Sequence, residues 1–410
     1  MNFRFYFAAL LAGAAFCLLL LGGCEGELED EGDPTIRVGL IASLSGPGRS
    51  WGEATLHAAQ VIADYHNELG GFEVDGRSYR IELLVEDDGL DPARAQRIAE
   101  RFVIEEDLRY LIGPLGDDSV VAAAQILDAY GAVYVHYGFD PSLLNEESLG
   151  LLGMPLPSQS IPVIADYLQH ELGIGSLMVI GRDGEESIHQ KRLSERMLDE
   201  RGLIVHRFAA FDVREETFDL AAEPVEAARQ MDRIRAIDPD GILFTGLSPG
   251  EFTAVAGRLR LGGYEGVLAA QNSQDPILLA GLEQGSGPRI VYVGGGFPDA
   301  ERSEYYLDLR NRFERLSGSV GAEFDTKLYA LETLLLLIRE GGAESLRETD
   351  HLREVMAVAE FDDPFFATPR ALRLTGERRF GARRQISIPI VVSQFQDGEA
   401  EVVYYSKEQD

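Results

Sequence analysis

Hydrophobic and polar positions divide the chain into three parts. An apolar run from Phe5 to Leu21 stands first, and an acidic stretch from Glu25 to Pro34 follows it. Beyond residue 34, short runs rich in β-branched and aromatic residues alternate with longer segments whose apolar residues recur at helical spacing. This alternation predicts the α/β class, with parallel sheets covered by helices on both faces.

The first section of the alternation predicts four strands and two helices. The strands are expected at residues 36–43, 80–85, 110–115 and 133–137. The first helix should begin near Trp51 with Ser50 as its cap and end at two glycines, residues 70 and 71. The second should begin after Asp91, because aspartate caps helices and Pro92 suits a first turn.

The alternation restarts after about residue 158 and predicts a second set of elements. Strands are expected at residues 176–180, 203–211, 241–245, 267–271 and 289–294, and helices at residues 188–201, 249–261, 300–316 and 323–339. The tail from Gln385 to Tyr405 predicts two strands joined at Asp397-Gly398. Two similar, doubly wound α/β lobes are the simplest interpretation.

The apolar run ends in Leu-Gly-Gly followed by Cys24, and it resembles the signal peptide of a bacterial lipoprotein, whose cysteine receives the lipid. We expect residues 1–23 to be the signal, Cys24 to be lipidated and residues 24–34 to form a solvated tether. The alternatives are a plain signal peptide or a spanning anchor, although about 17 apolar residues are few for a span. The expected location is extracytoplasmic, periplasmic or at the cell surface, on a membrane that the sequence does not identify.

The charge of the chain excludes two classes of partner. Asp and Glu number 69 against 37 Lys and Arg, for a formal net charge of -32. Nucleic acid is therefore not expected as a partner, because phosphate backbones require a basic surface. Contact with anionic lipid is not expected either, so membrane association should come only from the lipid anchor.

One segment has the pattern of a hydrolase nucleophile elbow. Ser248 lies in Gly-Leu-Ser-Pro-Gly, between an expected strand and an expected helix, and His351 lies downstream. The backbone N–H after the nucleophile normally forms half of the oxyanion hole, and Pro249 has none. We therefore expect no enzymatic activity and no catalytic residue. No cofactor is expected, and no metal site is expected either, because the seven histidines are scattered and none forms a His-x-x-x-His pair with an intervening Glu.

Four segments together resemble a known family. They are residues 36–47, 67–76, 87–92 and 111–115. In this order and spacing they resemble the solute-binding proteins of branched-chain amino-acid (Leu/Ile/Val) ABC transporters, which have the type I periplasmic-binding-protein fold. The resemblance implies two lobes joined by three crossovers, with residues 35–158 plus 287–382 in the first lobe and residues 159–286 plus 383–407 in the second. A ligand would bind between them, at the carboxyl ends of the strands.

The resemblance also implies a set of ligand-binding residues, taken position by position. They are Trp51, Leu115, Gly116, Asp117, Gly138, Asp140, Leu247, Asn272 and Phe324.

Two of these positions depart from the family pattern. Asp117 stands where amino-acid binders have a serine that holds the ligand carboxylate, and Asp140 stands where they have a threonine. Two aspartates would repel a carboxylate by about 1 to 4 kcal/mol at ~4 Å. A cationic ligand, a polyol or an amino acid in another orientation would fit better. The alternatives are that Asp117 or Asp118 only caps its helix and that Trp51 only anchors its helix.

The sequence therefore predicts a lipid-anchored solute-binding protein of an ABC importer, which captures a small polar molecule and passes it to a permease. The ligand would be an amino acid or a related compound, with a cation among the options. The alternative keeps the fold but makes the protein a ligand sensor or an envelope-assembly lipoprotein that acts through a protein partner.

Overall fold

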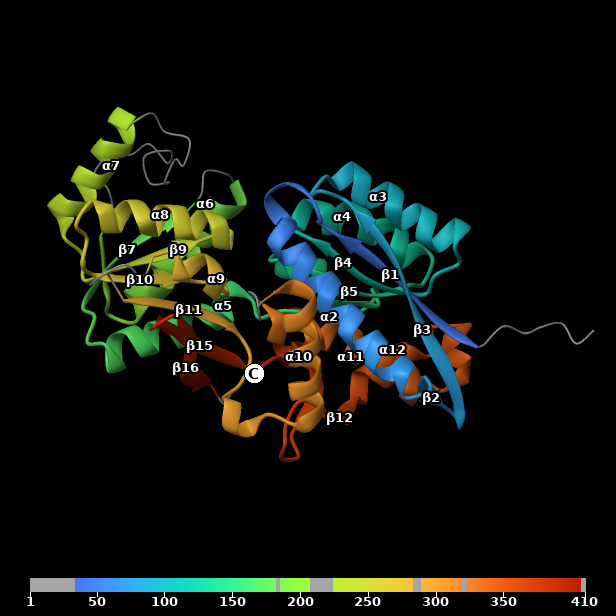
Figure 1. Ribbon diagram of the computed structural model, residues 1–410. Helices are drawn as coiled ribbons and strands as arrows, with labels where there is room; N and C mark the ends of the chain where they lie inside the picture. The colour runs from blue at the N-terminus through green and yellow to red at the C-terminus, as the bar shows by residue number, and fades with distance from the viewer. Residues whose placement is uncertain (1–33, 182–184, 207–223, 283–288, 319–322, 407–410) are drawn as a thin grey trace, which may run out of the picture. The chain divides into compact units, whose positions relative to one another are not determined.

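The computed structural model describes residues 34–181, 185–206, 224–282, 289–318 and 323–406 (Figure 1). Residues 36–410 form one compact unit. The predicted signal (residues 1–23), Cys24 and the predicted tether up to residue 33 lie outside the described residues.

The first sheet, over the described residues, has nine strands in the order β12-β13-β14-β6-β5-β4-β1-β3-β2. Their bounds are β1 Thr35–Ala42, β2 Phe72–Val74, β3 Arg77–Asp87, β4 Tyr110–Leu115, β5 Val133–Tyr137, β6 Gly150–Leu152, β12 Glu360–Asp362, β13 Ala371–Thr375 and β14 Gln385–Ile386. The central strands β1, β4, β5 and β6 pair in parallel. Antiparallel pairs stand at both edges.

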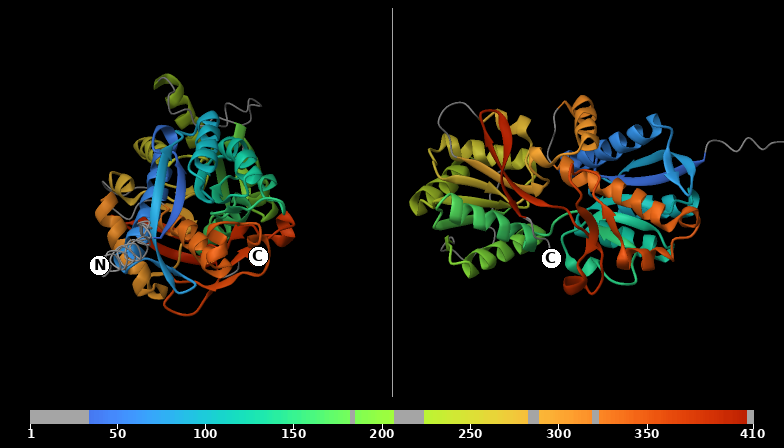
Figure 2. Two further views of the ribbon diagram at one scale, coloured as in Figure 1. Left: turned by 90° about the vertical axis from the view of Figure 1, so that its right-hand side faces the viewer. Right: turned by 90° about the horizontal axis from the view of Figure 1, so that it is seen from below.

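The second sheet has the order β16-β15-β11-β10-β9-β7-β8 within the described ranges. Its strands are β7 Ser176–Gly181, β8 Ile204–His206, β9 Gly241–Thr245, β10 Val267–Ala270, β11 Ile290–Gly295, β15 Ile390–Gln396 and β16 Glu399–Ser406. Strands β7 to β11 pair in parallel. Figure 2 shows the red C-terminal strands running beside this sheet, where β15 pairs antiparallel with β11.

Helices connect the parallel strands. Their bounds are α2 Arg49–Glu68, α3 Pro92–Glu100, α4 Asp117–Ala129, α5 Pro157–Asp166, α6 Glu185–Glu200, α7 Pro224–Ile237, α8 Pro249–Leu261, α9 Pro276–Ala280, α10 Glu304–Ser317, α11 Phe324–Gly341, α12 Leu352–Val358 and α13 Glu377–Phe380. Short 3₁₀ or π turns occur at Gly46–Gly48, Arg101–Glu105, Pro141–Leu143, Tyr167–Glu171, Asp299–Glu301 and Ala343–Leu346.

Successive strand residues pack on opposite faces of each sheet, as side-chain alternation requires. On β4, Ile112 packs in a core with α2, α10 and α11, whereas Leu111 packs in a core with α3 and α4. On β9, Phe244 packs with α8, whereas Leu243 packs with α5 and α6. Both faces of both sheets are thus apolar, which explains the continuous hydrophobic runs of these strands.

The predicted α/β class with two parallel-dominated sheets and three crossovers is confirmed. The chain forms β1 to β6 in the first sheet, β7 to β11 in the second, β12 to β14 in the first again, and β15 and β16 in the second. Two strands differ from the predicted partition. β11 was expected in the first lobe but pairs with β10, and β14 was expected in the second but pairs with β13 and β6. The partition came from the resemblance, and neither the apolar run of β11 nor the two residues of β14 indicates locally which sheet the strand joins.

The expected elements are present, and several boundaries differ. The helix expected at residues 300–316 begins at Glu304, and the strand expected from Gln385 is divided into β14 and β15. Ser50 does not cap α2, because the helix begins two residues before Trp51, at Arg49, and Gly48 is its N-cap. The strand expected at residues 203–211 is described only as β8, Ile204–His206, and residues 207–223 lie outside the described part. Asp91 caps α3 as predicted, and its carboxylate accepts bonds from the amides of Ala93 and Arg94.

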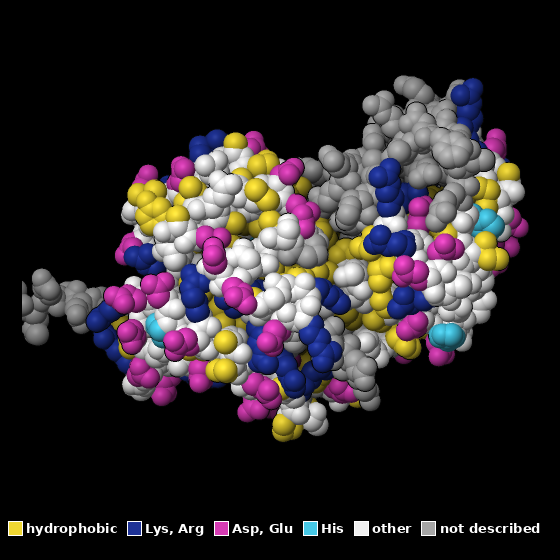
Figure 3. All heavy atoms as spheres, turned by 180° about the vertical axis from the view of Figure 1, so that it is seen from behind, with side chains coloured by type: hydrophobic (Ala, Val, Ile, Leu, Met, Phe, Trp, Pro, Cys, Tyr) yellow, Lys and Arg dark blue, Asp and Glu magenta, His cyan; other side chains and the backbone are white. Residues whose placement is uncertain are grey.

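Charged side chains are dispersed over one face of the molecule (Figure 3). On the face seen in Figure 3, acidic and basic side chains are interspersed, apart from one group of basic side chains near the lower edge. On that face, the large negative excess of the chain is therefore not gathered into a single patch.

Candidate functional site

A pocket of about 480 Å³ lies at the carboxyl ends of strands from both sheets. From the first sheet and its helices it is lined by Trp51, Leu90, Pro92, Leu115, Gly116, Asp117, Asp118, Ser119, Phe139, Met154, Pro155, Glu323, Thr326 and Lys327. From α5 and the second sheet it is lined by Pro157, Ser160, Gln190, Gly246, Gln271, Asn272, Ser273, Val293, Gly294 and Gly295. Its position is the usual one for ligands of parallel α/β sheets.

The start of α4 places a carboxylate on the pocket wall. Gly116 precedes the helix with φ 83°, a left-handed conformation that glycine adopts without cost. The Oδ1 of Asp117 accepts bonds from the amides of Phe139 (2.5 Å) and Asp140 (3.1 Å), on the loop after β5. Burial raises the pKa of Asp117, and these two amides oppose the rise. Asp117 thus fastens this loop to α4 and adds negative charge to the wall, beside the exposed Asp118.

One lysine enters the pocket wall from α11. The Nζ of Lys327 lies 3.1 Å from a carboxylate oxygen of Glu323 and 3.3 Å from the ring centroid of Tyr137. The side chain is 1% exposed, and burial lowers the pKa of Lys327 while Glu323 opposes that change. Lys327 is therefore matched by a protein carboxylate and an aromatic face.

The second sheet contributes amide and hydroxyl groups. The Nδ2 of Asn272 donates to the carbonyl oxygen of Leu247 at 2.9 Å, and the Oγ of Ser194 donates to the side-chain oxygen of Gln271 at 3.3 Å. These bonds fix the side chains of Asn272 and Gln271, which are neutral. The charged lining residues thus come from the first sheet and its helices, as three carboxylates and one ammonium group.

A close contact joins α11 to the end of β11. The amide of Gly295 donates to the Oγ1 of Thr326 at 3.1 Å. A Cβ at Gly295 would lie 2.4 Å from that Oγ1, so a side chain cannot replace the glycine without movement. This contact ties a helix of the first sheet to a strand of the second beside the pocket.

The structure brings five of the nine predicted ligand residues to this pocket. They are Trp51, Leu115, Gly116, Asp117 and Asn272. Trp51 is half-buried on α2, and its ligand contact stays a prediction. The interpretation of Asp117 as a cap of its own helix is wrong, because its carboxylate binds the neighbouring loop and Gly116 is the N-cap.

Four predicted ligand residues do not line the pocket. Leu247 is 1% exposed and packs in the core around β9 and α8, and Phe324 is 1% exposed and packs against Phe313 and Tyr306. Asp140 is exposed and accepts a bond from the amide of Ser142 in the next turn. Gly138 is buried, and a Cβ at this position would lie 2.5 Å from the Cδ1 of Leu143.

Sequence reasoning missed several lining residues. Gln190, Gln271 and Ser273 are polar and buried, and nothing in their local pattern separates them from surface residues. Lys327 gave a stronger signal: it is one of three lysines and stands within a long apolar helix pattern, where a cation requires a partner.

The hydroxyl of Ser248 has a structural role. It accepts a bond from the amide of Glu251, whose carboxylate in turn accepts one from the amide of Ser248, so the pair forms the capping box of α8. This arrangement accounts for the serine without catalysis.

The described residues include neither a metal-binding cluster nor a helix that could span a membrane. Within these ranges, no set of three or more His, Cys, Asp or Glu side chains is placed to hold a metal ion. None of the described helices combines the length and hydropathy of a membrane span.

Residues 35–398 match the model of a protein family described as "Periplasmic binding protein". Among curated proteins, the leucine-specific-binding protein of Salmonella typhimurium is 25% identical over 121 residues, which is 30% of each chain. The Leu/Ile/Val-binding protein BraC3 of Rhizobium johnstonii is 29% identical over 100 residues, which is 24% of this chain and 26% of the relative. These matches therefore span less than a third of either relative.

Solved structures share the fold over nearly the whole chain. The branched-chain amino acid transporter substrate binding protein LivJ of Streptococcus pneumoniae, in complex with isoleucine, superposes with a TM-score of 0.72 at 16% identity, over 91% of this chain and 100% of that one. A solute binding protein of an ABC transporter from R. palustris, in complex with benzoate, gives 0.71 at 16% identity, over 90% and 96%. At this identity the likeness concerns the fold.

Proposed function

Because the chain belongs to the periplasmic binding protein family, we propose that it is the extracytoplasmic solute-binding component of an ABC importer. The family consists of binding proteins, so the sequence prediction that the chain is not an enzyme is confirmed. In this proposal the pocket captures an amino acid or a related small polar molecule and releases it to a permease.

The observation that carries the proposal is the pocket itself. It is lined from both sheets, it has the volume of a small-molecule site, and its lining combines apolar side chains with charged, amide and hydroxyl groups. Its wall includes the start of α4, and a helix N-terminus by itself would favour an anion. Asp117 and Asp118 occupy this first turn and reverse the local charge.

The ligand in this proposal carries a positive charge and presents it to Asp117 and Asp118. The pocket has three carboxylates, of which Glu323 is paired with the single lysine. A ligand carboxylate at the start of α4 would meet repulsion of about 1 to 4 kcal/mol at ~4 Å. An ammonium or guanidinium group would be attracted instead. Asp118 therefore takes the place of Asp140, which the sequence predicted as the second acid of the site.

Attachment to a membrane through Cys24 belongs to the same proposal. The apolar run ending at Cys24 supports lipidation, and the acidic stretch behind it supports a solvated tether. A lipid anchor would keep the binding protein near its permease.

The proposal is tested by thermal unfolding of the purified protein against amino acids, amino-acid amides, polyamines, polyols and short peptides. A ligand at ~1,000 times its dissociation constant adds about 4 kcal/mol to the free energy of unfolding, which raises the melting temperature measurably. We expect stabilisation by cationic compounds. A folded protein that no compound stabilises would contradict the importer role and favour a sensor or assembly factor acting through a protein partner.

A further inference from the structure

Two of the residues that line the pocket have an unusual backbone conformation. Among the described residues, the non-glycine residues with positive φ are Asp75, Leu90, Asp107, Asp238, Glu323 and Asp397. Four are aspartates, which tolerate the left-handed region because their short side chains bond locally. The other two, Leu90 at φ 60° and Glu323 at φ 68°, both line the pocket. Strain of this kind persists only where surrounding contacts hold it, and it concentrates at functional sites.

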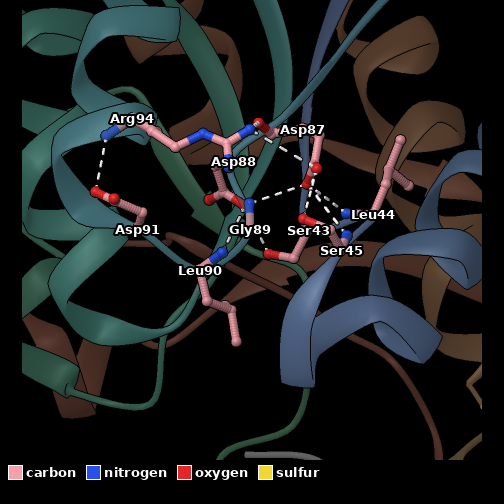
Figure 4. A network of polar contacts seen from close by, with 9 residues as sticks. All are labelled: Ser43, Leu44, Ser45, Asp87, Asp88, Gly89, Leu90, Asp91 and Arg94. Atoms are coloured by element: carbon pink, nitrogen blue, oxygen red, sulfur yellow. Dashed lines mark hydrogen bonds and ion pairs between the residues drawn. The ribbon is translucent and has the colours of Figure 1, made fainter.

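The backbone of Leu90 is held by a buried carboxylate. The Oδ1 of Asp88 accepts bonds from the amide of Leu90 (3.1 Å) and from the hydroxyl of Ser43 (2.7 Å), and Asp88 is fully buried (Figure 4). One aspartate therefore connects the turn that carries Leu90 to the turn that follows β1.

Asp87 makes a second connection between the same two turns. Its carboxylate accepts bonds from the amides of Leu44 (2.8 Å), Ser45 (3.2 Å) and Gly89 (2.9 Å), and from the hydroxyl of Ser45 (2.6 Å). The guanidinium of Arg94 donates to the Asp87 carbonyl oxygen at 2.6 Å. Figure 4 shows these groups converging on the acid pair between β1 and α3. The turn before α2 is thus tied to the turn before α3.

This arrangement directs the Leu90 side chain at the two helix starts that border the pocket. A Cβ at Gly48, the N-cap of α2, would lie 2.8 Å from the Leu90 Cδ1. A Cβ at Gly116, the N-cap of α4, would lie 3.8 Å from the Leu90 Cδ2. Leu90 therefore packs between the glycine that precedes the helix of Trp51 and the glycine that precedes Asp117.

We infer that Leu90 is a specificity-determining residue of the pocket, held in a left-handed conformation by Asp88, with Asp87 and Asp88 as positioning residues. The inference rests on the proposed function, since it takes the pocket to be the ligand site. With its backbone in the left-handed conformation, Leu90 places its side chain between the starts of α2 and α4. The space in front of Asp117 is then left to the ligand. A smaller residue there enlarges this corner and admits a larger apolar group.

The strain is tested by a glycine–alanine comparison in the full chain. Leu90→Gly and Leu90→Ala both remove the side chain beyond Cβ, so they differ mainly in backbone preference. At an ordinary position alanine is the more stable, whereas at a left-handed position glycine is. We expect Leu90→Gly to melt about 1 to 2 °C above Leu90→Ala. The control pair at Leu56, inside α2, should give the opposite order. Equal melting at position 90, or the order seen at Leu56, would overturn the inference.

The positioning role is tested through the single tryptophan of the chain, Trp51, which lies on the same pocket wall. Acrylamide quenching of its fluorescence should increase in Leu90→Ala, Asp88→Ala and Ser43→Ala. Ser43→Ala loses only one hydrogen bond, so it replaces Asp88→Ala in the comparison if Asp88→Ala does not fold. Asp91→Ala is the matched control: it removes the cap of α3, so the melting temperature should fall while quenching stays at the wild-type value. Unchanged quenching in Leu90→Ala, or an equal increase in Asp91→Ala, would refute the positioning role.

Failure of the proposed function and failure of this inference are distinguishable. If no compound stabilises the wild-type protein, the importer role fails. The order of melting temperatures at position 90 and the quenching of Trp51 are measured without ligand, so they still test the role of Leu90. Where a compound does bind, its chemical analogues with a longer apolar part should rank higher in affinity for Leu90→Ala than for the wild type. An unchanged ranking would contradict the assignment of specificity to Leu90.

Discussion

The ammonium nitrogen of Lys327 lies 3.3 Å from the ring centroid of Tyr137, at the wall of the pocket. The same nitrogen is paired with Glu323 at 3.1 Å. A buried cation is stable only when its lost hydration is replaced, and here a carboxylate and an aromatic face replace it. The lysine therefore stabilises this part of the wall and leaves the other pocket acids available to a ligand.

Replacing Lys327 by methionine should destabilise the protein. The Glu323 side chain is 16% exposed and would lose the ion-pair partner that compensates its burial. We expect a loss of about 2 kcal/mol in the free energy of unfolding, measured by denaturant titration. The double variant Glu323→Gln, Lys327→Met should lose less than the two single variants together. A single variant as stable as the wild type would show that the pair has no net effect.

Replacing Asp117 by asparagine should weaken the binding of a cation and leave the fold intact. The asparagine oxygen can still accept bonds from the amides of Phe139 and Asp140, so only the charge is lost. Affinity for a cationic ligand should fall at least about fivefold, as expected for the loss of one charge pair near 4 Å, worth about 1 kcal/mol or more. Asp140→Asn is the control, because Asp140 does not line the pocket. The affinity of this variant for the cationic ligand should match that of the wild type. Equal effects of the two variants would contradict the assignment.

The stability of the protein should depend on the protonation of Glu332. This residue lies on α11, accepts a bond from the Tyr305 hydroxyl at 2.8 Å, and burial raises its pKa to about 7. The unfolded chain releases this proton near pH 4.5 and the folded chain only near pH 7. The free energy of unfolding therefore falls between these values as pH rises, by about 3 kcal/mol in total.

Glu332→Gln should remove that penalty. The variant should match the wild type near pH 4.5 and exceed its melting temperature increasingly up to about pH 8. Glu340→Gln, at an exposed position of the same helix, should show no such trend. The measurement is thermal unfolding of the three proteins across this range. A gain for Glu332→Gln that is independent of pH would rule out titration of Glu332 as the cause.

Ser248→Ala should cost stability without affecting ligand binding. Loss of the N-cap of α8 should reduce the free energy of unfolding by about 1 kcal/mol. Glu251→Gln retains an acceptor for the amide of Ser248 and should cost less. Denaturant titration gives the stability, and loss of a hydrolytic activity in Ser248→Ala would contradict the capping role.

The sequence predicted the bounds of the strands better than it predicted which strands pair. β4 and β5 were predicted to the residue because both faces of the first sheet are covered, so the strands are continuous apolar runs between clear breaks. β11 is equally apolar, and its assignment failed because pairing with β10 depends on the path of the chain rather than on local pattern.

The site was predictable where a backbone feature fixed it. Gly116 and Asp117 lie at the start of a helix after a buried strand, and the sequence shows both. Leu247 and Phe324 were placed by resemblance alone. In the structure Leu247 packs in the core around β9 and α8, and Phe324 packs against Phe313 and Tyr306. Leu90 gave no signal, because leucine is not expected in the left-handed region, and the contact of its amide with Asp88 is a feature of the folded chain.

The central claim is that the pocket selects a positive charge and rejects a carboxylate at the start of α4. Isothermal titration with matched pairs tests it most directly: leucinamide against leucine, and agmatine against arginine. Each pair differs in whether the carboxylate is present, while the amine or guanidinium group is retained. The account predicts that the member without the carboxylate binds more tightly, at least about fivefold. Tighter binding of the carboxylate members would contradict it.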